Sequence, residues 1–530
     1  MNNRDVIFRD VTLDYLERVN LSNIPSPEQV GEDLFTCINV EINTQNAGRD
    51  KQDWIRKTEC IPPASLALVI KELNHVKLVS LAPQKRKENS LLVAYNEDGV
   101  NAGLYTTEAL FELAKRYHFT IDGKYYSELC THLRAELSIE NVQTFHSNYT
   151  ILNNGIFNHA TKSLEPFTPD LVYLSKPKIG YNPNAQNVYI KNPDGTTWDC
   201  DSWLQSISFD AEVNSLLWNV INSALRHTTR DKIVLFYAPS GCNGKGTFLA
   251  LLRNILGEEN CVSIPLSQFG ERFRTFQLLD CSANLVDENP VKEYAKTIND
   301  LKSVATSDVI TVEQKHGSFY SLRFHGVQIF CVNSLVRMGD DTDSFYRRVL
   351  TVPFPTSFTG RENKLIKKEY VTRKEVLEYF VKKALELGNS EEYVVPKVCE
   401  ELLGEYKRVN NPISDFLNEI LPKLVWDLVP YKFLFDCFKV WYKENCTGTP
   451  FGRNTFLEKL RQVITSEYSA SWTYTPKGRS VPPNGRMNKP EPLIAYYNLA
   501  DWMNSMYHGN DINEICRPDL KKKYEGLMRL

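Results

Sequence analysis

The stretch Ala238-Pro-Ser-Gly-Cys-Asn-Gly-Lys-Gly-Thr247 decides how the centre of this 530-residue chain is expected to fold. It follows the apolar run Ile233–Tyr237 and precedes a helical pattern over Phe248–Ile255. A strand, a glycine-rich loop with a lysine and a helix form the setting of a phosphate-binding P-loop. Small residues let backbone N–H groups surround phosphates, and the helix adds its positive N-terminus. The nucleotide-binding residues expected here are Ser240, Gly241, Cys242, Asn243, Gly244, Lys245, Gly246 and Thr247.

The match to the usual pattern G-x-x-x-x-G-K-[ST] is imperfect at two positions. Pro239 stands where the first Gly is usual, and Gly246 stands where a magnesium-binding hydroxyl is usual, with Thr247 directly after it. Lys245 is the compact cation that would bind the β- and γ-phosphates of ATP. Either Thr247 supplies the missing hydroxyl, or the metal depends on other ligands.

Two carboxylates and an amide follow at the ends of later apolar runs. Ala283–Val286 ends in Asp287 and Glu288, and Val327–Val332 ends in Asn333. We expect Asp287 to hold Mg²⁺ and Glu288 to orient the attacking water. Asn333 is expected beside the γ-phosphate.

A pair of arginines completes this set. Arg347 and Arg348 precede a fourth apolar run, Val349–Val352. An arginine in such a position can stabilise transition-state charge, often from a neighbouring subunit. The alternation of strands and helices predicts an α/β fold with a mostly parallel sheet.

The composition excludes several classes of protein. Hydrophobic residues make up 42% of the chain and the net charge is −3, which argues against global disorder and against a uniformly basic coat for nucleic acid. No stretch approaches the roughly 18 uncharged apolar residues of a membrane span, and the N-terminus lacks a signal-peptide pattern. The 12 cysteines are scattered without a C-x-x-C pair and are expected as reduced thiols. We expect a cytoplasmic protein.

The pattern after residue 412 predicts a winged helix. Helical runs over 414–424, 431–444 and 454–464 are followed by strand-like runs over Ser469–Tyr474 and Leu493–Tyr497. The stretch Phe451–Pro490 contains seven Lys and Arg against two Glu, a net of +5. We expect Arg453 and Asn454 to face base edges. The residues expected to touch phosphates are Lys477, Arg479 and Arg486.

The P-loop, the Asp-Glu pair, Asn333 and the two arginines resemble the motifs of superfamily 3 helicases, which are hexameric rings of the AAA+ type. The segment from Leu301 to His316 is similar to the part of that family that ends in a DNA-gripping hairpin. This resemblance implies that Lys315 and His316 contact single-stranded DNA in the ring channel. It covers roughly residues 95–415.

A narrower resemblance concerns the primase-helicases of phages and plasmids and their poxvirus relatives. The stretches Asn153–His159, Asp170–Pro183 and Val395–Asn410 are similar to that group. In its general character, the sequence is also similar to those of replication initiator helicases from phage satellites and staphylococcal mobile islands. This resemblance implies a bacterial host cytoplasm. Only about 90 residues precede the shared region, without an acidic triad or zinc-binding cysteines. We therefore expect a separate primase or host replication proteins as partners.

These observations divide the chain into six expected parts: an N-terminal domain of unknown role (1–90), a family-specific region (91–225), an AAA+ ATPase core (226–360), a helical segment (361–411), a winged helix that binds a duplex origin (412–505) and a basic tail (506–530).

The expected function is that of an ATP- and Mg²⁺-dependent replicative DNA helicase or initiator. Two alternatives are an origin-melting switch without processive unwinding and an RNA-directed viral NTPase. A small-molecule kinase is disfavoured, because it would need neither the paired arginines nor a basic module.

Overall fold

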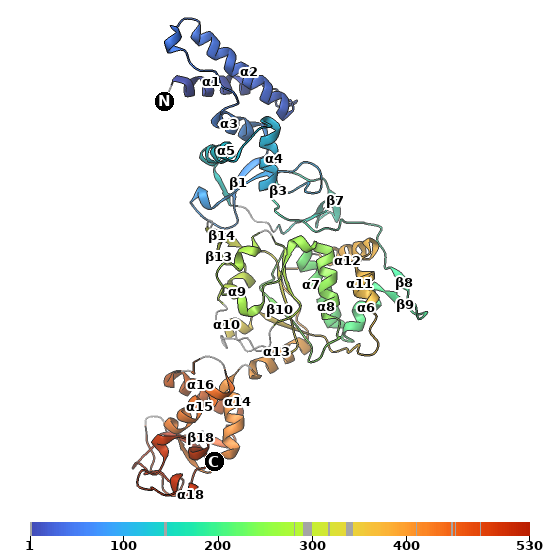
Figure 1. Cartoon of the computed structure of the whole chain (residues 1–530). Coiled ribbons are helices and arrows are strands. Elements are labelled where there is room, and N and C mark those ends of the chain that lie inside the picture. Colours follow the sequence, from blue (N-terminus) through green and yellow to red (C-terminus); the bar gives the residue numbers. More distant parts are fainter. Residues whose placement is uncertain are drawn as a thin grey trace. The chain divides into compact units, whose positions relative to one another are not determined.

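The chain is a mixed α/β protein with more than one compact unit (Figure 1). In the described part of the chain, residues from 3 to 334 and from 343 to 402 form the first unit, and residues from 403 to 530 form the second. No helix in this part combines the length and the apolar character that a membrane crossing requires. All twelve cysteines are free thiols. The computed structural model describes residues 3–141, 146–279, 281–289, 299–315, 319–334, 343–388, 390–409, 411–446, 449–450, 452–476 and 479–530.

The first 141 residues share one sheet and one core. The sheet has the order β3-β2-β1-β4, and β1 pairs with β2 in an antiparallel register that places Val76 opposite Ala94. The predicted boundary near residue 90 therefore falls between two paired strands, because the polar segment 84–88 is their connection. The elements are α1 (Asn3–Arg18), α2 (Pro27–Asn46), α3 (Pro63–Leu73), β1 (Val76–Ser80), β2 (Leu91–Tyr95), β3 (Tyr105–Thr106), α4 (Thr107–Tyr117), α5 (Gly123–Glu136) and β4 (Ile139–Asn141).

A segment of short strands and two helices leads to the central sheet. The first three strands form an antiparallel sheet and the next two form a hairpin that precedes α6. These elements are β5 (Tyr149–Leu152), β6 (Gly155–Asn158), β7 (Ser163–Glu165), β8 (Tyr189–Lys191), β9 (Thr197–Asp199), α6 (Cys200–Ile207) and α7 (Ala211–Leu225).

The central sheet has five strands in the order β11-β12-β15-β10-β16, and every neighbouring pair is parallel. All four apolar runs expected as strands are confirmed as strands of this sheet. Their nearly continuous apolar sequence fits a sheet that is buried on both faces. The strands and the elements between them are β10 (Ile233–Tyr237), α8 (Lys245–Leu256), β11 (Cys261–Val262), β12 (Ala283–Val286), α9 (Asn299–Ala305), β13 (Val309–Glu313), β14 (Phe319–Arg323), β15 (Val327–Val332), α10 (Asp343–Tyr346) and β16 (Val349–Pro353).

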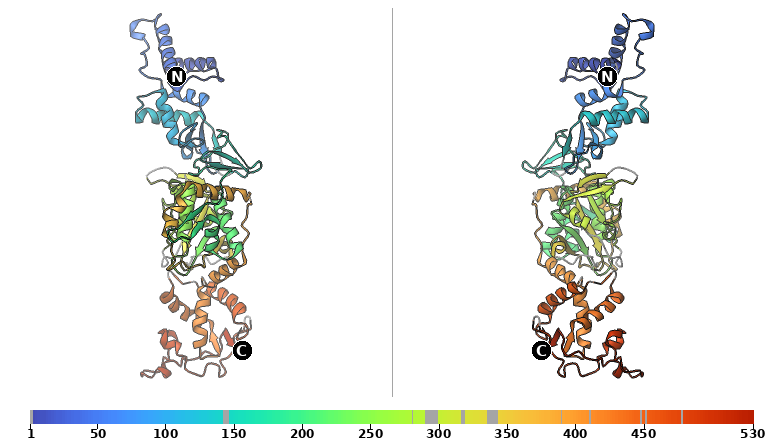
Figure 2. Two further views of the ribbon diagram at one scale, coloured as in Figure 1. Left: turned by 90° about the vertical axis from the view of Figure 1, so that its right-hand side faces the viewer. Right: turned by 90° about the vertical axis from the view of Figure 1, so that its left-hand side faces the viewer.

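Helices cover the central sheet and share its core. Helices α7, α8 and α12 pack on one another, and their buried side chains belong to the same cluster as those of β10, β12, β15 and β16. Figure 2 shows these green and orange helices around the sheet. Helices α11 (Lys364–Lys368) and α12 (Lys374–Glu386) follow β16 in the chain.

The second unit combines helices with a three-stranded antiparallel sheet of order β17-β19-β18. Helices α14, α15 and α16 form its core together with Trp426 and Trp472. Helix α13 (Lys397–Val409) precedes α14. The remaining elements are α14 (Pro412–Ile420), β17 (Leu428–Pro430), α15 (Tyr431–Asn445), α16 (Arg453–Glu467), β18 (Trp472–Tyr474), α17 (Leu493–Tyr496), α18 (Ile512–Ile515) and β19 (Gly526–Arg529).

The prediction of a strand over 493–497 is wrong. Leu493–Tyr496 is the helix α17, which Pro492 precedes as its N-cap residue. A short apolar run fits a buried strand and a buried helical turn equally well, and a proline favours the start of a helix. The partner of β18 is instead β19, which lies in the segment expected as a tail and pairs with both other strands.

Basic side chains are buried around the turn that joins α7 to β10. Arg226, His227 and Arg230 are each at most 5% exposed. Burial, together with the nearby His325, lowers the pKa of His227 to about 4. Burial, with Arg323 and His146, also lowers the pKa of His325 to about 4. These histidines are therefore neutral at pH 7 in the folded protein.

The first unit should lose stability as the pH falls from 6.5 toward 4. An unfolded histidine titrates near pH 6.5, so the stabilisation is complete above that value and is lost as the pH falls toward the folded pKa. Each histidine accounts for ~3 kcal/mol. Thermal unfolding followed by circular dichroism measures this loss. His227→Asn, which suits the left-handed backbone at φ 52°, should show a shallower dependence on pH. An equal dependence in both proteins would contradict the assignment.

Candidate functional site

The carboxyl ends of the parallel strands bring the predicted catalytic residues to one edge of the central sheet. The P-loop follows β10, Asp287 and Glu288 follow β12, and Asn333 follows β15. Because β15 lies between β10 and β12, Asn333 leaves the sheet between the P-loop and the two carboxylates. Ligands of open α/β sheets bind at this edge.

The loop between β10 and α8 has the backbone of an anion-binding turn. Cys242 and Gly244 have positive φ angles of 54° and 89°, and Gly244 is the residue before the first turn of α8. The loop is held from outside by two hydrogen bonds. The Asn243 side chain donates to the Thr356 carbonyl at 3.2 Å, and the Phe358 amide donates to the Cys242 carbonyl at 2.8 Å. The first amides of α8 therefore face the edge of the sheet with their positive dipole.

Lys245 and Asn333 are in direct contact. Lys245 is 8% exposed, and its Nζ donates a hydrogen bond of 2.9 Å to Oδ1 of Asn333. Burial lowers the pKa of Lys245, while Cys331 and Asp287 act in the opposite direction. Within the described residues, the acceptor recorded for this buried lysine is a neutral amide, which makes the lysine well suited to bind an anion.

The carboxylate of Asp287 lies over the first turn of α8. A Cβ atom added to Gly246 would be 3.0 Å from both carboxylate oxygens, so the missing side chain at this position makes room for Asp287. Nζ of Lys367 on α11 lies 3.7 Å from Oδ2 of Asp287. The three residues thus place a carboxylate, a cation and a helix N-terminus side by side.

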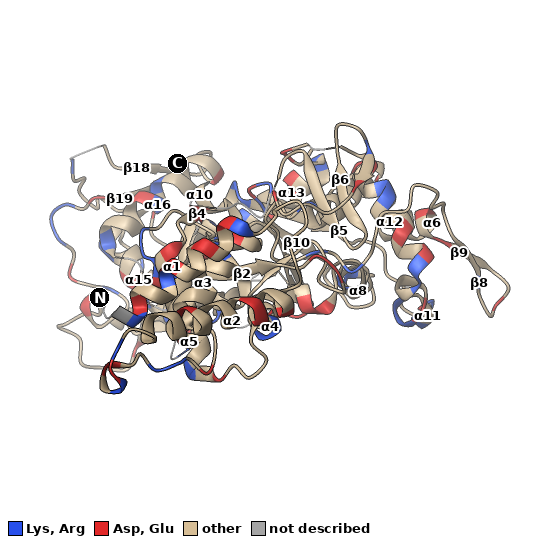
Figure 3. Cartoon of the chain, turned by 90° about the horizontal axis from the view of Figure 1, so that it is seen from above, with Lys and Arg blue, Asp and Glu red and all other residues tan. Residues whose placement is uncertain are grey.

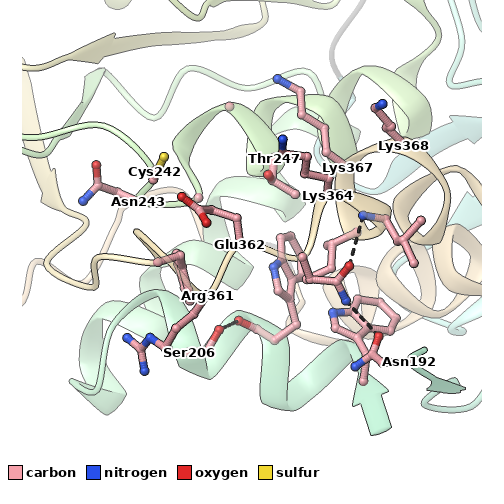
Figure 4. A pocket seen from close by; sticks show the side chains of 18 of the residues that line it. Asn192, Ser206, Cys242, Asn243, Thr247, Arg361, Glu362, Lys364, Lys367 and Lys368 are labelled. Carbon is pink, nitrogen blue, oxygen red and sulfur yellow. Dashed lines mark hydrogen bonds between the residues drawn. The ribbon is translucent and has the colours of Figure 1, made fainter. Parts of the chain in front are cut away.

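These residues line a cavity of about 1400 Å³ (Figure 4). Its walls come from three separate parts of the chain: residues 192–206, the P-loop with the residues after β12 and β15, and residues 358–368. The volume is sufficient for a nucleotide-sized ligand, since small-molecule pockets commonly measure about 300–1,000 Å³. The third wall is basic, and Figure 3 shows the short helix α11 as mostly blue. Its cationic lining residues are Arg361, Lys364, Lys367 and Lys368.

The structure brings together most, but not all, of the predicted nucleotide-site residues. Gly241 to Thr247, Asp287, Glu288 and Asn333 all line the cavity, whereas Ser240 is exposed and is not part of the lining. Among the described residues, no group of three or more His, Cys, Asp or Glu could hold a metal by itself.

The two arginines lie at the other edge of the sheet. Val349 at the start of β16 pairs with Ile233 at the start of β10, so Arg347 and Arg348 lie near the amino ends of the strands. The length of β16 separates them from the P-loop edge by roughly 13 Å. Arg348 donates to the carbonyl and the hydroxyl of Ser344, at 2.5 and 3.0 Å, whereas Arg347 is exposed.

The predicted DNA contacts occupy two other places. Lys315 is exposed at the end of the hairpin that β13 and β14 form, and Glu313 beside it accepts two hydrogen bonds of 2.6 Å from Arg272. His316 lies outside the described residues. In the second unit, the exposed predicted contacts are Arg453 and Asn454 at the start of α16 and Arg479 and Arg486 after β18; Lys477 lies outside the described residues.

Sequence reasoning did not find two walls of the cavity. Residues 192–206 precede the P-loop by about 40 positions, and residues 358–368 come after β16. Neither segment carries a motif. The run of cations from Arg361 to Lys368, which lies in the expected helical segment 361–411, is the sequence signal for the third wall.

Comparisons with known proteins give two partial family matches. Residues 236–348 match a family of unknown function, DUF5906, and residues 408–504 match a family described as poxvirus D5 protein-like. The expected likeness to poxvirus proteins is confirmed at the level of this family match. The match over residues 408–504 lies mostly after the stretches that suggested the likeness, which end at residue 410. The likeness to satellite and island helicases stays a prediction. No curated protein matches the chain.

Solved structures give a distant likeness. Two apo structures of the NrS-1 C-terminal region align with 88% and 78% of this chain and with 98% of their own chains. Their sequence identities are 12% and 13%, and both TM-scores are 0.39.

The contact of Gly246 with Asp287 leads to a stability prediction. Gly246→Ala should change the free energy of unfolding by less than about 1 kcal/mol, because the half-exposed ends of Asp287 and Lys367 are what must move. Gly326→Ala is the matched control, since its Cβ would lie 2.3 Å from the Ser282 carbonyl. It should cost about 2–3 kcal/mol. Thermal unfolding compares the two variants, and an equally large loss at Gly246 would mean that Asp287 is fixed.

Proposed function

We propose that the chain is an ATP hydrolase that acts as a replicative DNA helicase or initiator in a ring of identical subunits. The observation that carries this proposal is the cavity at the carboxyl edge of the central sheet. There the N-terminus of α8, the Lys245–Asn333 contact and the Asp287 and Glu288 carboxylates meet. These groups are what phosphoryl transfer from ATP to water requires.

Each side chain has a role in that reaction. The amides of the P-loop and Lys245 bind the phosphates, and Asn333 lies beside the γ-phosphate through its contact with Lys245. Glu288 accepts a proton from the water that attacks the γ-phosphorus, as the bond from that phosphorus to the β-phosphate oxygen breaks.

The residues present also fit a magnesium ion. Asp287, Glu288 and Thr247 line one cavity with oxygen donors only, which suits this hard cation. Mg²⁺ commonly takes one or two carboxylates together with substrate phosphates, so a dedicated cluster of ligands is not needed. We assign Asp287 and Thr247 as its ligands. The ion would neutralise charge on the phosphates, and Thr247 would replace the hydroxyl missing at Gly246.

The arginines require a second copy of the chain. Arg347 and Arg348 lie at the amino edge of the sheet, away from the cavity of their own subunit. The Arg348 side chain is hydrogen-bonded to Ser344, whereas the Arg347 side chain is exposed, so Arg347 is the arginine that a neighbouring subunit can reach. This placement supports a ring in which each nucleotide lies between two subunits. A hexamer is what the superfamily 3 resemblance implies.

DNA is the proposed partner of both units. The second unit has the order α14, β17, α15, α16, β18, β19, with the short helices α17 and α18 between the last two strands and with β19 in the middle of the sheet. This order supports a winged helix, with α16 as its recognition helix and the segment between β18 and β19 as the wing. In the first unit, the β13–β14 hairpin carries Lys315 toward single-stranded DNA.

The poxvirus D5 protein-like match supports a function in DNA replication over that of a small-molecule kinase. The melting-switch alternative shares every residue named here, and strand displacement on a long duplex separates it from a helicase. Stimulation of ATP hydrolysis by RNA rather than DNA would favour the RNA-directed alternative.

The nucleotide site is tested by Lys245→Ala. Loss of this ammonium should lower ATP turnover by about 100- to 1,000-fold, as removal of one preorganised transition-state donor commonly does. Lys374→Ala is the control, because Lys374 is exposed on α12 and is not a lining residue of the cavity. Phosphate release measures both. Turnover retained in the Lys245 variant would remove the P-loop from the mechanism.

Arg347 is tested by mixing variants. Arg347→Ala and Glu288→Gln should each be nearly inactive, but a mixture should recover ATP hydrolysis. At a mixed interface, one subunit supplies Glu288 and its neighbour supplies Arg347. Arg348→Ala should not be rescued in this way, because its side chain supports its own turn. A mixture without recovery would show that Arg347 does not act in trans.

The basic stretch of the second unit is tested by salt dependence. Arg479→Ala and Arg486→Ala should each weaken duplex binding for any sequence and lower the slope of log K against log salt by ~1. Lys423→Ala is the control, since Lys423 pairs with Glu419 outside this stretch. Fluorescence anisotropy measures the slopes. Unchanged slopes in both arginine variants would contradict the proposed wing.

A further inference from the structure

Lys367 is a cation of the cavity that the proposed reaction does not use. It belongs to the short helix α11, more than 100 residues after the P-loop. Its Nζ lies 3.7 Å from Oδ2 of Asp287, and 3.2 Å from the position that a Cβ on Gly246 would take. Figure 4 shows it on the same side of the pocket as Thr247. The ammonium thus lies over the first turn of α8, where the amides face the cavity.

The pair of Lys367 and Asp287 is weakly held. The side chains are 52% and 51% exposed. Exposed ion pairs contribute little to stability, so either partner can leave at a small cost. In the proposed function the two partners bind opposite charges. The Asp287 carboxylate binds the metal cation, and the Lys367 ammonium lies beside the anionic phosphates.

We infer that Lys367 is a second phosphate-binding lysine, which exchanges the Asp287 carboxylate for the phosphates of the incoming nucleotide. This inference rests on the proposed ATP site. The several negative charges of a triphosphate attract the ammonium more strongly than one half-exposed carboxylate does. The flexible stem of lysine permits the movement without a change in α11.

The exchange couples nucleotide binding to the metal site. Without a nucleotide, Lys367 neutralises Asp287 and lowers its affinity for a cation. When phosphates take Lys367, the carboxylate becomes available. Removal of Lys367 therefore has opposite effects on the two ligands. ATP loses a cation and binds more weakly, whereas a metal ion alone meets an unneutralised Asp287 and binds more tightly.

The test uses the full chain with Lys367→Ala and Lys367→Gln, and with Lys374→Ala as the control. Lys374 has a side chain that is 81% exposed and pairs with Glu378 on α12. ATP affinity is measured by calorimetry in EDTA, where a metal does not contribute. Mn²⁺ affinity is measured by electron paramagnetic resonance without a nucleotide.

Both Lys367 variants should bind ATP about tenfold more weakly, as expected for the loss of one charged hydrogen bond. They should bind Mn²⁺ more tightly than the wild type, and Asp287→Asn should abolish this gain. Lys374→Ala should match the wild type in both measurements. Circular dichroism checks that each variant is folded.

The outcomes separate this inference from the proposed function. If the wild type does not bind ATP, or if Lys245→Ala binds it equally well, the proposed site itself fails. If Lys245 is needed but both Lys367 variants bind ATP like the wild type, only the role of Lys367 is overturned. An equal Mn²⁺ signal in the wild type and the variants, whether zero or not, overturns the exchange.

Discussion

The parallel arrangement of β12, β15 and β10 is the constraint on which the rest of the first unit depends. Because the three strands run in one direction, the residues that follow them meet at one edge. This places a helix N-terminus, the Lys245–Asn333 contact and two carboxylates around one cavity, although Gly241 and Asn333 are 92 positions apart in the sequence. A strand with the opposite direction would move its polar residues to the other edge and separate the groups.

The same constraint separates the two arginines from the cavity. Since β16 is parallel to β10, the residues before β16 must lie at the amino edge of the sheet. Arg347 therefore lies away from the cavity of its own chain, and in the proposed reaction a neighbouring copy would bring it to the nucleotide. One cavity and one arginine on opposite edges of each copy would suit the proposed ring, which needs a head-to-tail interface that closes.

Much of the sheet edge that carries the cavity could be predicted from the sequence, because each motif is local. An apolar run followed by a glycine-rich loop, by Asp287 or by Asn333 fixes both the strand and the residue at its end. The walls over 192–206 and 358–368 could not be predicted in this way. They reach the cavity through tertiary packing of β8, β9 and α11, and Lys367 carries no local signal of its proximity to Asp287.

Other parts of the fold could not be predicted for similar reasons. The polar segment 84–88 fits a linker between domains and a connection between paired strands equally well, and only the pairing of β1 with β2 decides between them. In the second unit, Leu493–Tyr496 has the apolar character of a strand but forms a helix. The strand that completes the sheet comes from the last residues of the chain, where a basic run hides the short apolar segment of β19.

A structure of the full chain determined with a non-hydrolysable ATP analogue, Mg²⁺ and forked DNA would test the nucleotide site and the role of Arg347 together. The account predicts a ring of identical subunits with the triphosphate at Lys245 and the N-terminus of α8, and with Arg347 of the adjacent copy beside the γ-phosphate. A monomer with the analogue at another site, or a ring in which Arg347 lies far from every nucleotide, would contradict it.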